Sequence, residues 1–364
     1  MLNRIVLLIM AFVMLAAFSL RKKKWNDAEL KEQKTQLGRL MFFDKKLSNP
    51  DGQSCTVCHA PKTSFSDPDH LAVSEGMLDG FFVNRNGPTL SYSAFVPPLH
   101  YDKTMEEWRG GLFWDGRSNS LEHQLSGPFF NIAEMNNADT AMLVAEVRNA
   151  DYYKLYKSIY GKSKSDEEIY TNMTDAIATF ERGIFINEFS SKFDLFLDGK
   201  VLLNEDEMLG LALFGGKAKC SNCHSLKPQD GRVLFSDFSY HNLGVARNEA
   251  NPFYTTDISV NPLGRDAIDL GLGAVVKEEK QNGKFRTPTL RNVQYTGPFF
   301  HNGAMESLEE VVHFINTRNH GMFAAPEVKE NVENEFTGNL KLSEEEEQWL
   351  VAFLLALSDG YAVE

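Results

Sequence analysis

Two short stretches decide how this chain is interpreted: Cys55-Thr-Val-Cys58-His59 and Cys220-Ser-Asn-Cys223-His224. Both have the spacing C-x-x-C-H, and together they use all four cysteines of the 364 residues. In c-type haem attachment, two thiols add to the haem vinyl groups and the adjacent histidine ligates the iron. The sequence therefore predicts two covalent c-type haems. The residues expected to hold them are Cys55, Cys58 and His59 for the first haem and Cys220, Cys223 and His224 for the second.

Paired cysteines have three other common uses: a zinc ribbon, a redox C-x-x-C site and disulfides. A zinc site built from both pairs would need no histidine after either pair. A thioredoxin-like site would not occur twice without its βαβ context. Haem attachment explains both histidines and leaves no cysteine over, and it requires an oxidising, exported compartment.

The N-terminus agrees with export. An apolar run from Ile5 to Phe18 is short for a membrane span of about 20 residues but suits the core of a signal peptide. Ala17-Phe18-Ser19 fits a cleavage site, whereas the basic residues 21–24 resist translocation. We interpret residues 1–24 as an export signal, cleaved or retained as a membrane anchor through residues 1–20. The expected location is periplasmic or exported.

Composition narrows the class of protein and of partner. Hydrophobic residues make up 43% of the chain and charged residues 24%, so a packed core is expected. The formal net charge of −13 argues against nucleic acid as a partner. It favours basic protein partners or simple solubility, and it leaves a homodimer open.

A weak internal repeat precedes the two haem motifs. Leu37-Gly38-Arg-Leu-Met-Phe42 leads to the first motif, and Leu209-Gly210-Leu-Ala-Leu-Phe214 leads to the second. Each predicts a short helix that runs into a haem-binding turn. We therefore expect two related haem domains, an N-terminal one at residues 25–200 and a C-terminal one at residues 201–364.

Hydrophobic spacing predicts the other elements. Apolar residues at helical intervals indicate helices between Met142 and Leu197, and again at Leu308–Asn316 and Glu344–Leu357. Ser343 before a run of glutamates is a good N-terminal cap. Residues 228–284 are rich in Gly, Pro, Asn and Asp and indicate loops. No sustained alternation of period two occurs, so the fold class should be mostly α with long loops.

Four further stretches lie around the two motifs. They are Arg85-Asn86-Gly87-Pro88-Thr89-Leu90, Phe113-Trp114-Asp115-Gly116-Arg117, Gln124 with Gly127-Pro128 and Glu134-Met135, and Arg286-Thr287-Pro288-Thr289-Leu290-Arg291-Asn292 through Phe300-His301-Asn302-Gly303. In order and spacing, the region from about Leu37 to Tyr361 resembles the bacterial dihaem cytochrome c peroxidase/MauG family. The resemblance implies two cytochrome c-like haem domains, with hydrogen peroxide reacting at the N-terminal haem and electrons relayed by the C-terminal haem.

The resemblance also implies roles for four residues. Glu134 would be the acid/base that moves a proton between the peroxide oxygens, a task that suits a carboxyl group whose pKa burial raises. Gln124 would donate a hydrogen bond to peroxide, and Pro128 would shape the distal wall. Trp114 would lie between the haems as a stepping stone for electrons.

A calcium ion between the haems is implied as well. Asn86 matches the side-chain ligand of the family, and backbone carbonyls near Arg286 and Pro288 would complete the protein ligands. Calcium prefers oxygen ligands, including amides and carbonyls.

Two departures from the family pattern matter. Met77 stands where switching peroxidases carry a histidine that closes the first iron, and His70 is out of register, so we expect the first haem to be open. Ile315 stands at the position of the second haem's distal Met or Tyr, and isoleucine cannot ligate iron. His313 is two residues away and on a helix faces elsewhere.

Three more side chains near these positions bear on ligation. His320 and Met322 follow Ile315 within reach of a loop, which leaves the axial ligands of the second haem and its potential open. His301 is expected to organise the haem propionates or the region between the haems.

Three functions follow from these expectations. The leading one is a cytochrome c peroxidase, which takes electrons from a small cytochrome c or cupredoxin and reduces hydrogen peroxide to water. The alternative is a MauG-like enzyme that uses peroxide to oxidise a residue of a partner protein. A non-catalytic electron-transfer cytochrome is the third, but it would need neither Glu134 nor Gln124.

Overall fold

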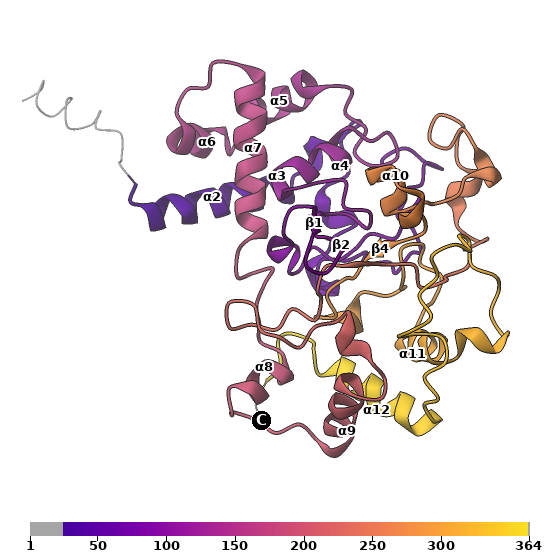
Figure 1. Ribbon diagram of the computed structural model, residues 1–364. Helices are drawn as coiled ribbons and strands as arrows, with labels where there is room; N and C mark the ends of the chain where they lie inside the picture. Colours follow the sequence, from indigo (N-terminus) through magenta and orange to yellow (C-terminus); the bar gives the residue numbers. More distant parts are fainter. Residues whose placement is uncertain (1–24, 363–364) are drawn as a thin grey trace, which may run out of the picture.

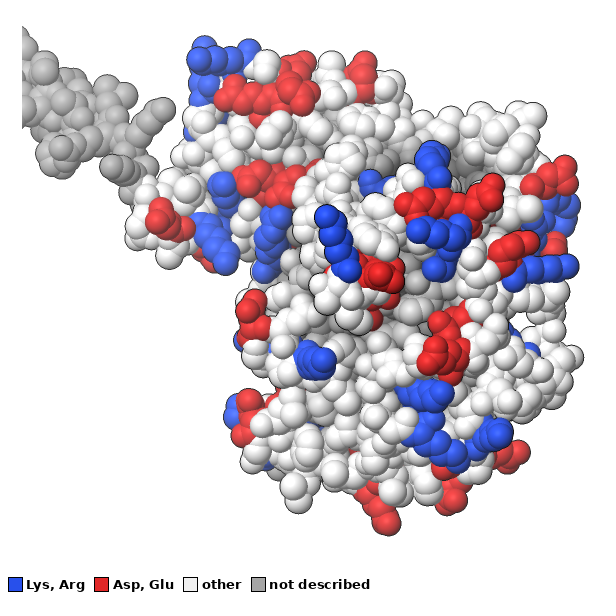
Figure 2. Space-filling view, viewed as in Figure 1, with Lys and Arg blue, Asp and Glu red and all other residues white. Residues whose placement is uncertain are grey.

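The computed structural model describes residues 25–362, so the expected export signal at residues 1–24 lies outside the described part. The chain is mostly helical, with long loops and very short strands, as Figure 1 shows. No helix among residues 25–362 is long and apolar enough to cross a membrane. On the face shown in Figure 2, acidic and basic side chains are interspersed.

The elements follow the expected regions closely. The α-helices are α2 (Asp27–Phe42), α3 (Leu121–Gln124), α4 (Ser126–Phe130), α5 (Thr140–Asn149), α6 (Tyr153–Tyr160), α7 (Asp166–Glu181), α8 (Lys192–Leu197), α9 (Glu205–Gly215), α10 (Leu272–Val276), α11 (Leu308–Thr317) and α12 (Glu344–Leu355). The strands form two antiparallel pairs, β1 (His100–Asp102) with β2 (Glu107–Arg109) and β3 (Tyr240–His241) with β4 (Phe285–Arg286).

The helical region predicted between Met142 and Leu197 contains α5 to α8, and the two later helices are α11 and α12. The predicted loop region is mostly loop, interrupted by β3 and α10. Ser343 caps α12 as expected: its side chain accepts from the backbone N–H of Glu346, whose carboxylate accepts from the backbone N–H of Ser343. Such a capping box satisfies two backbone donors of the first turn.

Two large hydrophobic clusters form the cores. The first draws its buried residues from positions 37–186 and includes Met41, Phe42 and Phe180. The second draws on positions 193–357 and includes Phe214 and Phe353. In Figure 1 the helices α2 and α7 of the first cluster lie apart from α9 and α12 of the second. A domain boundary at residue 200 stays a prediction.

The repeated glycines explain how each core is built. A Cβ atom on Gly38 of α2 would lie 1.9 Å from the carbonyl oxygen of Ala176 in α7. A Cβ atom on Gly210 of α9 would lie 2.0 Å from the carbonyl oxygen of Trp349 in α12. Each glycine therefore lets two helices cross in direct backbone contact. The first helix, at 16 residues, is longer than the short helix expected.

Candidate haem sites

The proximal side of the first site is centred on His59. Its imidazole is buried, and burial lowers its pKa, which keeps the ring neutral. Its Nδ1 atom lies 3.0 Å from the carbonyl oxygen of Phe65. When Nδ1–H donates to that carbonyl, Nε2 keeps its lone pair, and the ring is oriented as an iron ligand requires.

The second site repeats this arrangement. The Nδ1 atom of His224 lies 2.9 Å from the carbonyl oxygen of Phe235, and burial lowers the pKa of His224. Phe65 and Phe235 both have positive φ, 59° and 51°, a conformation that bulky residues rarely adopt. The same strained turn therefore aims a carbonyl at each histidine.

Two threonines hold these turns in place. The hydroxyl of Thr89 donates to the carbonyl of Ser64 at 2.5 Å, and that of Thr289 donates to Leu234 at 2.8 Å. Both acceptors directly precede the positive-φ phenylalanines. The Pro-Thr-Leu segments of the two halves are thus equivalent supports of the proximal side.

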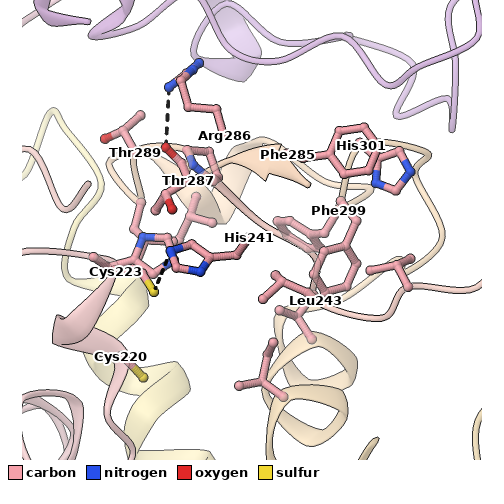
Figure 3. A pocket seen from close by; sticks show the side chains of 18 of the residues that line it. Cys220, Cys223, His241, Leu243, Phe285, Arg286, Thr287, Thr289, Phe299 and His301 are labelled. Carbon is pink, nitrogen blue, oxygen red and sulfur yellow. Dashed lines mark hydrogen bonds between the residues drawn. The ribbon is translucent and has the colours of Figure 1, made fainter. Parts of the chain in front are cut away.

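A largely apolar cavity lies beside Cys220, Cys223 and His224. Figure 3 shows the two cysteines on one side of it and Leu243 and Phe299 on the other. The cavity and the orientation of His224 fit the haem that the motif predicts.

Two polar groups of the cavity wall also fit a haem. The guanidinium group of Arg286 is buried, its pKa is lowered by burial, and among residues 25–362 it forms no ion pair. Its hydrogen bonds go to the carbonyls of Phe113 and Thr287, both at 3.4 Å. A buried cation requires an anionic partner, and a haem propionate is one.

His301 is the second polar group. Its ring stacks on Phe285 at 3.6 Å, and its Nε2 atom is buried without a hydrogen-bond partner among the described residues. Burial lowers the pKa of His301 to about 4, so the ring is neutral near pH 7. Its carbonyl accepts from the backbone of Asn86 at 2.8 Å, which ties it to the segment between the sites. A role with propionates stays a prediction.

The residues predicted for the distal side of the first site come from α3, α4 and the turn after them. Gln124 ends α3, Pro128 lies in α4, and Glu134 follows four residues after α4. Gln124 is partly buried, and its side chain has no hydrogen bond to the described residues. Its amide is therefore not committed within the protein.

Glu134 is held by its neighbours. The side-chain amide of Asn131 donates to its carboxylate at 2.7 Å. Burial raises the pKa of Glu134, while the bond from Asn131 and the charge of Arg117 oppose the rise. The charge of Glu134 also acts on Cys55 and Cys58, which places the carboxyl group near both thiols. This is the environment that a proton-transferring carboxyl group needs.

The loop at residues 60–80 does not bring a histidine toward this region. Met77 donates its backbone N–H to the carbonyl of Glu134 at 2.8 Å, and its sulfur lies 3.5 Å from the hydroxyl of Ser48. His70 is exposed, with Nδ1 2.9 Å from the carbonyl of Gly297. Met77, at the position of the switching histidine, is therefore held by contacts with Glu134 and Ser48.

Trp114 and Asn86 are hydrogen-bonded to each other beside the cavity of the second site. The indole N–H of Trp114 donates to the carbonyl of Asn86 at 2.8 Å, and both residues line the cavity of the second site. A Cβ atom on the next residue, Gly87, would lie 3.9 Å from Cε1 of His59. This short segment thus passes near His59 of the first site and lines the cavity of the second.

The three predicted calcium ligands line one cavity. Asn86, Arg286 and Pro288 all line the same cavity, and the side-chain NH₂ of Asn86 donates to Ala72 at 3.2 Å, which leaves its oxygen available. Among residues 25–362, no three His, Cys, Asp or Glu side chains are grouped to hold a metal ion. Calcium stays a prediction that depends on amide and backbone oxygens.

Arg85, Asp115 and Asp269 form an ion triad that the sequence did not reveal. Arg85 donates to both carboxylate oxygens of Asp269, at 2.6 and 2.7 Å, and to Asp115 at 2.6 Å. The guanidinium of Arg85 holds the pKa of Asp269 at about 2, against the opposing effect of burial. Asp269 lies in the predicted loop region, where nothing in the sequence distinguishes it from other loop acids.

A second unforeseen group is Glu181 at the end of α7. Its side chain is 1% exposed, and its Oε2 atom has no hydrogen-bond partner among the described residues. Burial raises the pKa of Glu181 to about 8, against the charge of Arg182. Its charge acts on Cys55, so a carboxyl group that is largely neutral at pH 7 lies near the first haem motif.

The distal side of the second site contains Ile315, which lines the cavity as its family position implies. His313 faces away: its Nδ1 lies 3.1 Å from the carboxylate of Glu347 in α12. His320 is exposed and lies 3.2 Å from the side chain of Asn339, and Met322 is 65% exposed. None of these three lines the cavity.

Comparison with known proteins agrees with these sites. The family model for di-haem cytochrome c peroxidase matches residues 32–201. The methylamine utilization protein MauG of Paracoccus denitrificans is 33% identical over 347 residues, covering 89% of this chain and 88% of that protein. The cytochrome-c peroxidase IdrP1 of Pseudomonas sp. strain SCT is 32% identical over 350 residues, covering 92% and 83%.

The fold has a solved counterpart of similar size. The crystal structure of the diheme peroxidase BthA from Burkholderia thailandensis superposes with a TM-score of 0.77 at 30% identity, covering 90% of this chain and 86% of that one. The match thus extends over both haem sites. The chain belongs to the dihaem cytochrome c peroxidase/MauG family.

Proposed function

We propose that this peroxidase-type oxidoreductase reduces hydrogen peroxide at its first haem site with electrons that pass through the second. In the overall reaction, one hydrogen peroxide takes up two electrons and two protons and gives two water molecules. The observation that carries the proposal is the carboxyl group of Glu134, raised in pKa by burial, near both cysteines of the first site.

The protein's own residues then have distinct tasks. The bound haem supplies the iron at which the O–O bond is cleaved. Glu134 accepts a proton from one peroxide oxygen and returns it to the other, and the uncommitted amide of Gln124 orients the peroxide by a hydrogen bond. Pro128 limits the space on this side, since it lies in α4 between these two residues.

Electrons reach the first site from the second through the segment of Trp114 and Asn86. The indole lines the second cavity and donates at 2.8 Å to the carbonyl of Asn86, and a Cβ atom on the next residue, Gly87, would lie 3.9 Å from His59. The electron donor is a small redox protein such as a cytochrome c or cupredoxin. The haems are attached covalently through the four cysteines, in an exported or periplasmic protein, with calcium near Asn86.

The substitution Glu134→Gln tests the proposal. It removes the acid/base but keeps the size of the side chain, so we expect both haems to remain bound and peroxide turnover to fall by about 10²–10⁴-fold. The exposed Glu309→Gln is the matched control and should retain full activity. Turnover of Glu134→Gln within about threefold of the wild type would remove Glu134 from this role.

A second candidate is MauG-like oxidation of a residue on a partner protein. It is favoured by the exposure of His70 and its contact with Gly297, because no histidine of that loop then closes the first iron. The same preparations separate the two functions. Rapid turnover with a reduced cytochrome supports the peroxidase, whereas oxidising equivalents that persist for minutes after peroxide alone support the alternative.

A further inference from the structure

Helix α11 turns one continuous apolar face to the cavity of the second haem site. Leu308, Val311, Val312 and Ile315 all line that cavity. Their spacing of three, four and seven residues places them on one side of the helix. None of these side chains contains an atom that can ligate iron.

The donor side chains of the same region are engaged elsewhere. His313 lies on another face of α11 and pairs with Glu347 at 3.1 Å. Asn316 is buried and donates to the carbonyl of Leu342 at 3.0 Å. The position of Ile315 is thus not compensated by a neighbour on the helix.

The wall around Ile315 continues in apolar residues from other segments. Leu243, Val245, Phe299 and Phe300 also line the cavity, and Figure 3 shows Leu243 and Phe299 across from the cysteines. This wall offers no hydrogen bond to a bound molecule.

Two polar side chains of the lining, Asn242 and Thr337, have partners within the protein. Asn242 donates to the carbonyls of Val328 and Glu330, at 2.9 and 2.8 Å. The hydroxyl of Thr337 donates to the carbonyl of Glu333 at 2.8 Å. These groups are therefore not free to stabilise a charged or strongly polar ligand.

We propose that the iron of the second haem has no protein ligand on its distal side. The apolar wall around Ile315 then forms a binding site for a small uncharged diatomic molecule, of which carbon monoxide and nitric oxide are examples. The polarity and the hydrogen-bond donors of a distal pocket decide which ligands a haem accepts. A neutral diatomic needs no donor, whereas an anion would lose its hydration without compensation. The inference requires a haem at Cys220 and Cys223, but it does not depend on peroxide turnover.

Counting bound carbon monoxide tests this site. The chemically reduced holoprotein is titrated with carbon monoxide, and the equivalents bound per chain are read from the haem absorbance. We expect two equivalents for the wild type and one for Ile315→Met, because a methionine there supplies a thioether to the second iron in a side chain of similar volume. His313→Met places the same side chain on the other face of α11 and should still bind two.

Each other result has a defined meaning. One equivalent for the wild type and none for Ile315→Met would show that only the second iron is open, which supports the proposal and contradicts an open first site. One equivalent for the wild type and also one for Ile315→Met, with unchanged absorbance, would show that a protein group, such as His301, already ligates the second iron, and this would overturn the proposal.

Azide tests the chemical class of the ligand. Added to the oxidised holoprotein, it should bind at no more than one iron, that of the first site with its amide and carboxyl groups. Azide binding that is lost in Ile315→Met would show that the second site accepts anions, and this would overturn the restriction to uncharged ligands.

Discussion

At the first haem site His59 lies 3.0 Å from the carbonyl of Phe65, and at the second His224 lies 2.9 Å from that of Phe235. Both carbonyls belong to residues of positive φ that follow a threonine-clamped turn. On the distal side the predicted residues differ: Glu134 is the residue proposed for the first site, whereas Ile315 lines the cavity of the second. The proximal side orients an iron ligand, a task common to both haems, whereas the distal side decides what each iron binds.

The two halves also differ in whether a buried glutamate has an ion-pair partner. Glu181 near the first site forms no ion pair among residues 25–362, and burial raises its pKa to about 8. Glu207 in α9 is also buried but pairs with Lys192 at 2.7 Å. Burial without an ion-pair partner favours the neutral form of a carboxyl group.

The largest expected effect is the pH dependence of protein stability that Glu181 causes. Between the ordinary carboxyl pKa near 4.5 and the folded pKa of about 8, Glu181 is ionised in the unfolded chain but still protonated in the folded protein. The free energy of unfolding therefore falls as the pH rises through this range. One pKa unit corresponds to about 1.4 kcal/mol, so the loss can approach about 4 kcal/mol between pH 5 and 8. Denaturant unfolding at several pH values should show that Glu181→Gln removes this decline. Glu207→Gln should leave it in place, and an equal decline in Glu181→Gln would refute the assignment.

The next largest effect concerns the ion pairs of Arg85, which connect segments near the two sites. Arg85→Met leaves Asp269 without its cation, while Asp115 keeps Arg117 at 2.9 Å, and breaking a buried ion pair on one side costs about 3–5 kcal/mol. Arg265→Met is the matched control, because Arg265 and its partner Glu249 are 64% and 72% exposed and such pairs contribute about 0–1 kcal/mol. Unfolding of the holoproteins measures both changes. Equal losses in Arg85→Met and Arg265→Met would mean that the buried triad contributes no more to stability than an exposed ion pair.

The smallest effect tests the equivalence of the helix crossings. Gly210→Ala places a methyl group against the carbonyl of Trp349, so we expect a loss of about 1–3 kcal/mol. Gly38→Ala should cost about as much in the first core. Gly215→Ala is the control in the same helix, since its Cβ would lie 3.6 Å from Leu226, an ordinary contact. If Gly210→Ala is as stable as Gly215→Ala, the crossing is looser than described.

The sequence was informative wherever the cause is local. Haem motifs, helix caps and the faces of α11 depend on residues a few positions apart, and His313 indeed faces Glu347 while Ile315 lines the cavity. The pairing of Arg85 with Asp269 joins segments far apart in the chain, so no local pattern could reveal it. From its sequence context Glu181 would be a solvent-exposed charge at a helix end. Its burial follows from tertiary packing, which the local sequence does not encode. The roles of Glu134, Gln124, Pro128 and Trp114 stay predictions until measured.

The hydrogen bond from Trp114 to Asn86 has a consequence for the charge of an oxidised indole. An indole that has lost an electron is a far stronger acid at its N–H than the neutral indole, and it loses the proton if a base is there to accept it. Here the acceptor is a backbone carbonyl at 2.8 Å, which accepts a hydrogen bond but is far too weak a base to take the proton. A Trp114 oxidised in this position would remain a radical cation, and an electron could refill it without waiting for a proton to return.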